Sequence, residues 1–223
     1  MTKLRGDLEP LTARLSMLPL DARGYPVPWF VAWVDSPSGK RVPDFRVVDS
    51  AKFTQAVKER RCWVCGGPLG RWLAFPIGPM CAITRTTSEP PCHLECAAWS
   101  VRNCPFLANP SLLRNDRELP AIAEEAAGFG LQRNPGVICL WMTRSFEVFR
   151  VQAGNRGVLI TIGDPAQVTW WREGRRATVE EVEASVSGGF PALLEVAKLQ
   201  GPFAVEELGK QFKRAAILWQ GQP

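Results

Sequence analysis

Hydrophobic and polar residues follow two different spacings along this chain, and together they predict an α+β protein. Short apolar runs bounded by proline, glycine or aspartate predict strands, whereas apolar residues three or four positions apart predict helices. The predicted strands are 29–34, 45–49, 73–75, 82–85, 137–143, 145–152, 158–163 and 167–172. The predicted helices are 50–60, 93–101, 120–127, 178–187, 191–200 and 204–219.

The N-terminal third combines a helical pattern with a predicted hairpin. Leucines at positions 4, 8, 11, 15 and 18 suit an amphipathic helix within residues 1–24. Strands 29–34 and 45–49 flank a loop rich in proline, serine and glycine, so we expect them to pair. Ser50 is the expected N-cap of the following helix, because a serine hydroxyl accepts hydrogen bonds from the first free amides.

The C-terminal part contains four consecutive strands followed by helices, which predicts a small antiparallel meander covered by helices. Thr178 and Glu181 have the spacing of a capping box, which predicts a helix start. The pair Gly188-Gly189 predicts the end of that helix, because glycine favours the conformation that terminates helices.

Composition places the chain among ordinary globular proteins. It has 223 residues, of which 46% are hydrophobic and 22% charged, so a disordered chain is excluded as the main interpretation. The longest strongly apolar run, 29–34, is far shorter than the roughly 20 residues of a membrane-spanning helix. The opening MTKLRGDLEP lacks the apolar core of a secretion signal. We therefore expect a cytoplasmic protein that does not contact a membrane.

Seven cysteines suggest a metal site. Six of them fall within residues 62–104, and an odd number without a secretion signal argues against a disulfide framework. Clustered thiols in a reducing compartment more often hold a metal ion. The cysteines are Cys62, Cys65, Cys81, Cys92, Cys96, Cys104 and Cys139.

Two ligand pairs stand out within this cluster. Cys62 and Cys65 are followed by two glycines, which lets the backbone turn its amides toward the sulfurs, as in a zinc knuckle. His93 and Cys96 follow two prolines and begin a helix, about one turn apart on one face. A knuckle, a hairpin made by 73–75 and 82–85, and a helix that carries two ligands resemble a treble-clef zinc finger. We predict tetrahedral, structural Zn²⁺ on these four residues.

Other ligand sets stay open at this point. Cys92 could replace His93, and Cys81 or Cys104 could also substitute. An iron–sulfur cluster on four of the thiols and a set of buried, unligated thiols are further alternatives. A redox pair at Cys62 and Cys65 is disfavoured, because Gly-Gly-Pro follows where such motifs continue as a helix. Cys139 lies in an apolar run and is expected in the core.

The lone histidine excludes whole classes of chemistry. If His93 binds zinc, no imidazole is left to act as the general base of an HNH nuclease or a Ser-His-Asp hydrolase. Glu95 gives a deaminase-like His-x-Glu, but the Cys-x-x-Cys pair lies upstream instead of downstream and lacks the preceding proline. We expect Glu95 to complement the dipole at the start of the helix instead.

The net charge is mildly positive, its excess is N-terminal, and two clusters of basic residues stand out. The net charge is +5, with 11 basic and 7 acidic residues in 1–61 and equal numbers in 120–223. Both clusters are candidate nucleic-acid contacts, and in the second a tryptophan could stack on bases. The alternatives are a cationic helix end for the first and core packing for the second. The candidates are Lys58, Arg60, Arg61, Arg71, Trp171, Arg172, Arg175 and Arg176.

Several stretches are similar to uncharacterised proteins of bacteriophages and prophages. They are GYPVPWFVAW, FRVVD, CWVCGGPLG, FPIGPMCAITRTTSEPPCHLECAAWSVRNCPFL and WWREGRRATVEEV, so the resemblance spans most of the chain. It implies an origin in a mobile element and a location in the bacterial host cytoplasm. It implies no activity and no catalytic residues.

These observations predict an α+β protein with two regions. Residues 1–118 are expected to form a treble-clef-like zinc-binding region with an N-terminal hairpin and helix, and residues 119–223 a small antiparallel sheet plus helices. The functional hypothesis is a non-catalytic, phage-related zinc-binding protein that engages nucleic acid or a host protein. The alternative is an enzyme that uses a catalytic zinc or carboxylates, with nuclease-like or deaminase-like activity.

Overall fold

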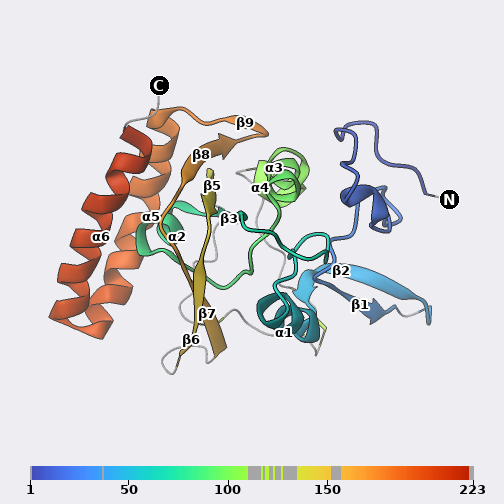
Figure 1. Cartoon of the computed structure of the whole chain (residues 1–223), viewed down its shortest axis with the longest axis horizontal. Helices are drawn as coiled ribbons and strands as arrows, with labels where there is room; N and C mark the ends of the chain where they lie inside the picture. The colour runs from blue at the N-terminus through green and yellow to red at the C-terminus, as the bar shows by residue number, and fades with distance from the viewer. Residues whose placement is uncertain are drawn as a thin grey trace.

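The chain is an α+β fold of small antiparallel sheets and packed helices, as predicted (Figure 1). The computed structural model describes residues 2–36, 38–109, 117, 119–120, 123, 127, 135–151 and 157–220. The strands are β1 Val31–Asp35, β2 Arg41–Val48, β3 Leu73–Ile77, β4 Thr86–Thr87, β5 Ile138–Thr143, β6 Phe146–Val151, β7 Gly157–Ile162, β8 Gln167–Arg172 and β9 Arg175–Arg176. The helices are α1 Ser50–Lys58, α2 Pro79–Thr84, α3 Leu94–Asn103, α4 Pro105–Ala108, α5 Val179–Gln200 and α6 Pro202–Gln220, with a 3-10 turn at Leu15–Met17.

The predicted N-terminal hairpin is confirmed, with a longer second strand. β1 and β2 pair antiparallel, and α1 follows directly. The helix is capped by Asp49 and not by Ser50, since the Asp49 carboxylate accepts hydrogen bonds from the amides of Ala51 and Lys52 at 3.1 and 3.3 Å. The residue before the predicted cap is therefore the one that satisfies the first free amides.

The central sheet joins residues from both predicted regions. Its order is β3-β5-β8-β9, and β3 pairs with β5 from Leu73 opposite Thr143 to Ile77 opposite Cys139. The predicted four-strand meander is therefore wrong, because β6 pairs with β7 in a separate sheet that also includes β4. Burial explains the division: five of the six residues of β5 are buried, as in the middle of a sheet, whereas β6 is mostly exposed.

Three predicted elements differ in the structure. Residues 82–85 lie at the end of α2, because Gly78-Pro79 opens a helix there, and so they are not a strand. Four of the five leucines of the helix predicted within residues 1–24 pack on the core from irregular chain, and only the turn Leu15–Met17 is helical; the four are Leu8, Leu11, Leu15 and Leu18. The helices 178–187 and 191–200 are one helix, α5, which continues through Gly188-Gly189. Gly189 lies so close to the side chain of Met80 that glycine there permits close packing of α2 on α5.

The predicted helix 120–127 lies mostly outside the described residues. Of the helices that the structure does describe, none combines the length and the apolar character needed to cross a bilayer.

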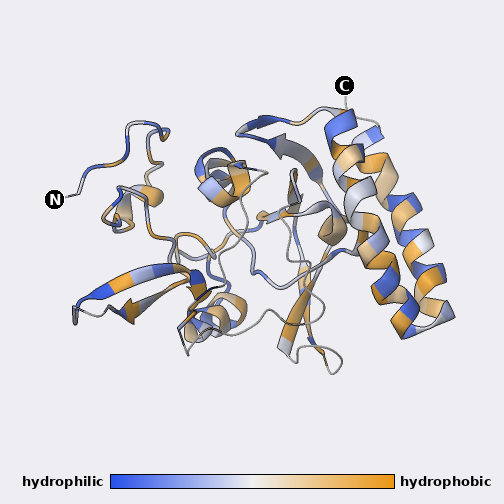
Figure 2. Cartoon of the chain, turned by 180° about the vertical axis from the view of Figure 1, so that it is seen from behind, coloured by the Kyte–Doolittle hydropathy of each residue, from blue (hydrophilic) through white to orange (hydrophobic). Residues whose placement is uncertain are grey.

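The main core lies between the central sheet and the helical hairpin of α5 and α6. Trp141, Trp170 and Phe75 are fully buried there, and the Trp170 ring meets Trp219 of α6 edge to face at 6.0 Å. Figure 2 shows hydrophobic and hydrophilic residues interspersed along both helices, as expected for helices packed on one side only. A second cluster of buried residues surrounds the cysteines and includes Trp63 and Trp99.

Substitution of Glu181 tests the capping box at the start of α5. The Thr178 hydroxyl accepts from the Glu181 amide at 3.3 Å, the Glu181 carboxylate accepts from the Thr178 amide at 2.9 Å, and Arg175 binds the same carboxylate. The hydrogen bond from Arg175 lowers the pKa of Glu181 to about 2. We expect Glu181→Gln to lower the free energy of unfolding by about 1 kcal/mol at neutral pH.

The pH dependence of this difference provides the check. Because the pKa is lower in the folded state, the stabilisation is complete above the unfolded value near 4.5 and is lost as the pH falls toward 2. Thermal melts of wild type and variant should therefore differ at pH 7 and converge in acid. A difference that is constant with pH would show that the carboxylate charge is not involved.

Candidate metal centre

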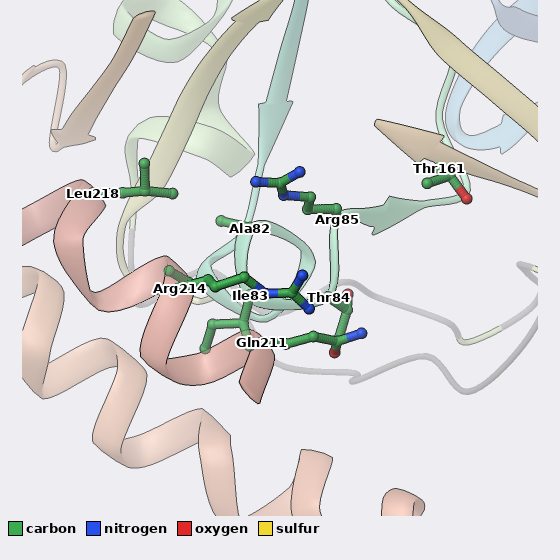
Figure 3. Close-up of a pocket in the computed structure, with 9 residues that line it drawn as sticks. Ala82, Ile83, Thr84, Arg85, Thr161, Gln211, Arg214 and Leu218 are labelled. Carbon is green, nitrogen blue, oxygen red and sulfur yellow. The ribbon is translucent and has the colours of Figure 1, made fainter. Parts of the chain in front are cut away.

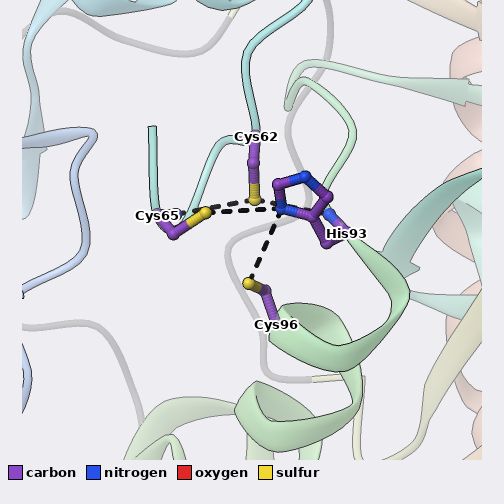
Figure 4. Close-up of side chains that lie close together, drawn as sticks. All are labelled: Cys62, Cys65, His93 and Cys96. Carbon is purple, nitrogen blue, oxygen red and sulfur yellow. Dashed lines mark hydrogen bonds between the residues drawn. The ribbon is translucent and has the colours of Figure 1, made fainter. Parts of the chain in front are cut away.

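Three thiols and one imidazole converge between the knuckle and the start of α3 (Figure 4). The ligand atoms of Cys62, Cys65, His93 and Cys96 all lie within 4.8 Å of one another. His93 Nδ1 is 3.3 Å from Cys65 Sγ and 3.9 Å from Cys96 Sγ. Bond lengths of about 2.3 Å to sulfur and 2.0 Å to nitrogen put neighbouring ligands of a tetrahedral zinc about 3.5–3.8 Å apart. The group could hold a metal ion, and its donors and spacing are consistent with zinc.

Backbone hydrogen bonds shape the knuckle. The amide of Cys62 donates to the carbonyl of Gly67, and the amide of Gly66 donates to the carbonyl of Cys62, both at 2.8 Å. Gly66 has a φ of +73°, and a Cβ there would lie 2.6 Å from the ring of Trp29. Only glycine combines this conformation with this close approach. The sequence prediction that glycine is needed after the cysteine pair has this physical basis.

The second ligand pair is presented by the start of α3. His93 is the N-cap of the helix and not a member of its first turn, whereas Cys96 is in the first turn. The preceding residue, Cys92, forms a two-way backbone bridge with Ala74 of β3, at 2.8 and 2.9 Å. This bridge fixes the direction in which the chain enters the helix, so that His93 and Cys96 both reach the knuckle.

Hydrogen bonds around the ligands orient them for a cation. The ring Nε2 of His93 lies 3.0 Å from the carbonyl oxygen of Pro68, to which it can donate, leaving Nδ1 as the free electron-pair donor. Cys62 Sγ accepts hydrogen bonds from the amides of Cys65 and His93, at 3.5 and 3.3 Å. Such amides stabilise a thiolate and hold it in place.

Hydrogen bonds among the clustered thiols shift their pKa values in opposite directions. The thiol of Cys65, followed by those of Cys92 and Cys96, donates to Cys62, so the pKa of Cys62 lies below the usual value. The pKa of Cys65 and that of Cys96 are raised because each thiol donates to the thiolate of Cys62. Binding of a metal ion would displace the protons of Cys65 and Cys96, so acid should weaken it.

Arg14 supplies positive charge at the rim of the centre. Its guanidinium pairs with the carboxylate of Glu95, Nε to Oε1 at 2.6 Å, and this hydrogen bond raises the pKa of Arg14, with smaller contributions from Cys65 and Cys96. Three thiolates and one imidazole on Zn²⁺ carry a net charge of −1, which a nearby guanidinium offsets. Glu95 lies in the first turn of α3, as expected, and its carboxylate binds Arg14.

The other cysteines lie outside the group of four. Cys92 donates to Cys62 but is buried behind it on the β3 side. Burial raises the pKa of Cys81 to about 11 and also raises the pKa of Cys104 and of Cys139, so these thiols stay protonated at neutral pH. The single histidine of the sequence belongs to the group of four, so the chain has no second imidazole.

The two predicted basic clusters lie apart. The first cluster flanks the knuckle in the chain: Lys58 ends α1, Arg60 and Arg61 come just before Cys62, and Arg71 follows the knuckle. The second cluster lies on β8 and β9, which Figure 1 shows well separated from α1. The structure therefore does not combine the eight residues into one surface.

Carboxylates already compensate much of the second cluster. Arg175 makes two hydrogen bonds to Glu181, at 2.7 and 2.9 Å, and Arg172 lies 3.4 Å from the same carboxylate. Trp171 is half-buried, with the guanidiniums of Arg102 and Arg176 at 5.8 and 4.7 Å from its ring centroid. Of its three arginines, Arg176 alone has no carboxylate partner among the described residues.

The first cluster has two neighbours that sequence reasoning missed. Trp72 is 39% exposed, and the guanidinium of Arg144 lies 4.3 Å from its ring centroid. The two residues meet because Leu73 and Thr143, beside them in the chain, are paired in the central sheet. No local sequence signal reports that pairing, although an exposed tryptophan next to Arg71 is itself visible in the sequence.

A cavity of about 200 Å³ lies between α2, β7 and α6 (Figure 3). Arg85 and Arg214 border it. Each is paired with a carboxylate, Arg85 with Asp164 at 2.5 Å and Arg214 with Glu207 at 2.8 Å. No cysteine or histidine lines the cavity, so it is separate from the candidate metal centre.

Replacement of Gly66 tests the knuckle geometry. Gly66→Ala puts a Cβ against the Trp29 ring at a positive φ, so we expect a loss of roughly 2–3 kcal/mol in the free energy of unfolding. Gly70→Ala is the matched control, because nothing lies within 4 Å of a Cβ there. Chemical denaturation of both variants measures the difference, and equal stabilities would contradict this account of the knuckle.

Metal content tests the ligand set. We expect natively purified protein to contain one zinc per chain by elemental analysis, and Cys65→Ser or Cys96→Ser to lower that content sharply. Cys92→Ala and Cys104→Ser should keep it, because both thiols lie outside the group of four. Loss of zinc in Cys92→Ala, with the fold intact by circular dichroism, would transfer a ligand role to Cys92.

Comparisons with protein-family models, with curated proteins and with solved structures give no significant match.

Proposed function

We propose that this chain is a non-catalytic, zinc-stabilised protein that binds nucleic acid through the surface beside the knuckle. That surface, the knuckle patch, consists of Lys58, Arg60, Arg71, Trp72 and Arg144. All five are exposed, and among the described residues the four cations have no carboxylate partner. This uncompensated charge next to an exposed tryptophan is the observation that supports the proposal.

The proposal gives the metal a structural role. Four protein ligands leave no open position on a tetrahedral zinc, whereas a catalytic zinc keeps one for water or substrate. A hydrolase or nuclease would also need a general base, and the only imidazole is in the group of four. The enzyme alternative therefore has less support than a binding role.

The centre fits a treble-clef-like finger with an insertion. The knuckle supplies Cys62 and Cys65, and α3 supplies the other pair. In place of the predicted return strand at 82–85, the bridge between Cys92 and Ala74 returns the chain alongside β3. Residues 78–90, with α2 and β4, would then be an insertion into the hairpin of the finger.

The candidate metal centre would also hold two arginines of the knuckle patch in position. The amide of Leu69 donates to the carbonyl of Arg60 at 2.8 Å, so Arg60 and Arg71 project from the two sides of the knuckle stem. Arg61, by contrast, folds back onto Glu59 and the carbonyl of Gly66, at 2.7 and 3.2 Å. A metal ion that holds the knuckle would thus fix the positions of the two guanidiniums.

The preference for nucleic acid follows from charge. Guanidiniums bind phosphate oxygens in a fixed, bidentate geometry, and phosphate contacts provide most of the affinity of such proteins. A bacteriophage or prophage origin and a location in the host cytoplasm are part of the same proposal. A host protein as the partner is the outcome to consider if nucleic acid fails to bind.

Salt dependence of binding is the test. We expect labelled oligonucleotides to bind at low salt, with affinity that falls as salt rises because bound counterions are released. The triple variant Arg60→Gln, Arg71→Gln, Arg144→Gln should bind at least about tenfold more weakly and show a shallower salt slope. Fluorescence anisotropy measures both quantities.

A matched control separates the patch from general charge. Lys213→Gln removes an exposed cation of α6, which has no carboxylate partner among the residues described, and should leave the affinity unchanged. Zinc content and circular dichroism show that each variant is folded. Absence of binding to any DNA or RNA at low salt would refute the proposal and make a pull-down of host proteins the next measurement.

A further inference from the structure

We infer that the knuckle patch takes single-stranded nucleic acid, with an unpaired base stacked on Trp72; this inference rests on the proposed function. Sequence-tolerant binding of single strands combines cations that follow the backbone with aromatic rings on which bases stack. The knuckle patch has both cations and an exposed aromatic ring, and they lie close together in space.

Trp72 is held in a position suited to stacking. The guanidinium of Arg144 lies 4.3 Å from its ring centroid, which restrains the indole by a cation–π contact. Even so, 39% of the residue is exposed. Most tryptophans of this chain are used differently: Trp63, Trp99, Trp141, Trp170 and Trp219 are buried. An indole that is restrained and still exposed is available to a base.

A second aromatic residue extends the patch. The Arg60 guanidinium lies 5.6 Å from the ring centroid of Phe146, at the start of β6. Phe146 is half-buried, and its ring packs edge to face on Phe75 at 6.3 Å. The patch thus has two arginine–aromatic pairs, Arg144 with Trp72 and Arg60 with Phe146, built on the same end of the sheets.

The register of the central sheet explains how these pairs meet. Leu73 of β3 is opposite Thr143 of β5, so the residues just outside, Trp72 and Arg144, lie at the same end of an antiparallel pair. Phe146 follows two residues after Arg144. The arginine–aromatic surface is therefore composite, with Arg60 and Trp72 from the zinc-binding region and Arg144 and Phe146 from the C-terminal sheets.

The shape of the patch disfavours duplex readout. A duplex exposes only base edges, which proteins usually read with a helix or a two-stranded ribbon in the major groove. Here α1 ends at Lys58, and the arginines project from the knuckle stem and from the turn between β5 and β6. Arginine and tryptophan presented on turns suit the backbone and the exposed ring faces of a single strand.

The test compares three ligands of equal length: a 12-nucleotide single strand, a blunt 12-base-pair duplex and a 12-unit abasic strand. Anisotropy should show the single strand bound at least about tenfold tighter than the abasic strand, because base stacking is absent from the latter. The duplex should bind more weakly than the single strand at the same salt concentration.

Substitutions of Trp72 identify the stacking surface. We expect Trp72→Ala to weaken single-strand binding about tenfold or more, and Trp72→Phe to retain most of it. The duplex affinity should change little in either variant. Phe203→Ala on α6, at a residue that is 78% exposed, is the control for nonspecific contact with aromatic residues and should behave as wild type.

The outcomes distinguish this inference from the proposed function. Equal, salt-dependent binding of single strand, duplex and abasic strand would overturn the inference and leave the proposed function in place. Binding of none of them would remove the proposed function itself. Unchanged single-strand affinity in a folded Trp72→Ala protein with normal zinc content would also overturn the inference.

Discussion

Three thiols and an imidazole within 4.8 Å of one another are the arrangement on which the N-terminal half depends. The knuckle has little regular structure of its own, apart from the bridge between Arg61 and Pro68. Burying several thiolates together without a cation would be unfavourable because their charges repel. A zinc ion bound there would remove that repulsion and tie the knuckle to α3, and Arg14, which pairs with Glu95 at the rim, would offset the remaining charge. The same metal contact would fix the two ends of the knuckle, where the amide of Leu69 donates to the carbonyl of Arg60.

The residues of the candidate metal centre could be predicted from the sequence, whereas the pairing of strands far apart in the chain could not. The spacing of Cys62 and Cys65, and of His93 and Cys96, indicated the group that the structure brings together, because ligand spacing depends on a few neighbouring residues. The partner of β3 was missed, because alternation of hydrophobic residues reports that a segment is a strand but not which strand it joins. The prediction that Gly188-Gly189 ends a helix was wrong because of another long-range contact. Packing of α2 against α5 at Gly189 outweighs the weak helix propensity of glycine.

The number of basic residues in a stretch of this sequence does not show which of them are free to contact a ligand. The stretch that contains Arg172, Arg175 and Arg176 places three basic residues within five positions, yet Glu181 pairs with two of the three. The four cations of the knuckle patch, by contrast, have no carboxylate partner within the part of the chain that the structure describes. The sequence alone could not distinguish the two basic clusters, because ion pairing across a turn and between strands depends on the tertiary structure.

The position of β3 has a consequence for synthesis on the ribosome. Its partner β5 is separated from it by about 60 residues, which take roughly 3–12 s to emerge at ordinary elongation rates. During that interval the pairing partner of β3 that the described residues provide is the segment around Cys92. Early uptake of the metal by the nascent chain would hold that segment in place and shield an unpaired strand edge from aggregation. Availability of zinc during translation would then govern the yield of folded protein as well as its stability once complete.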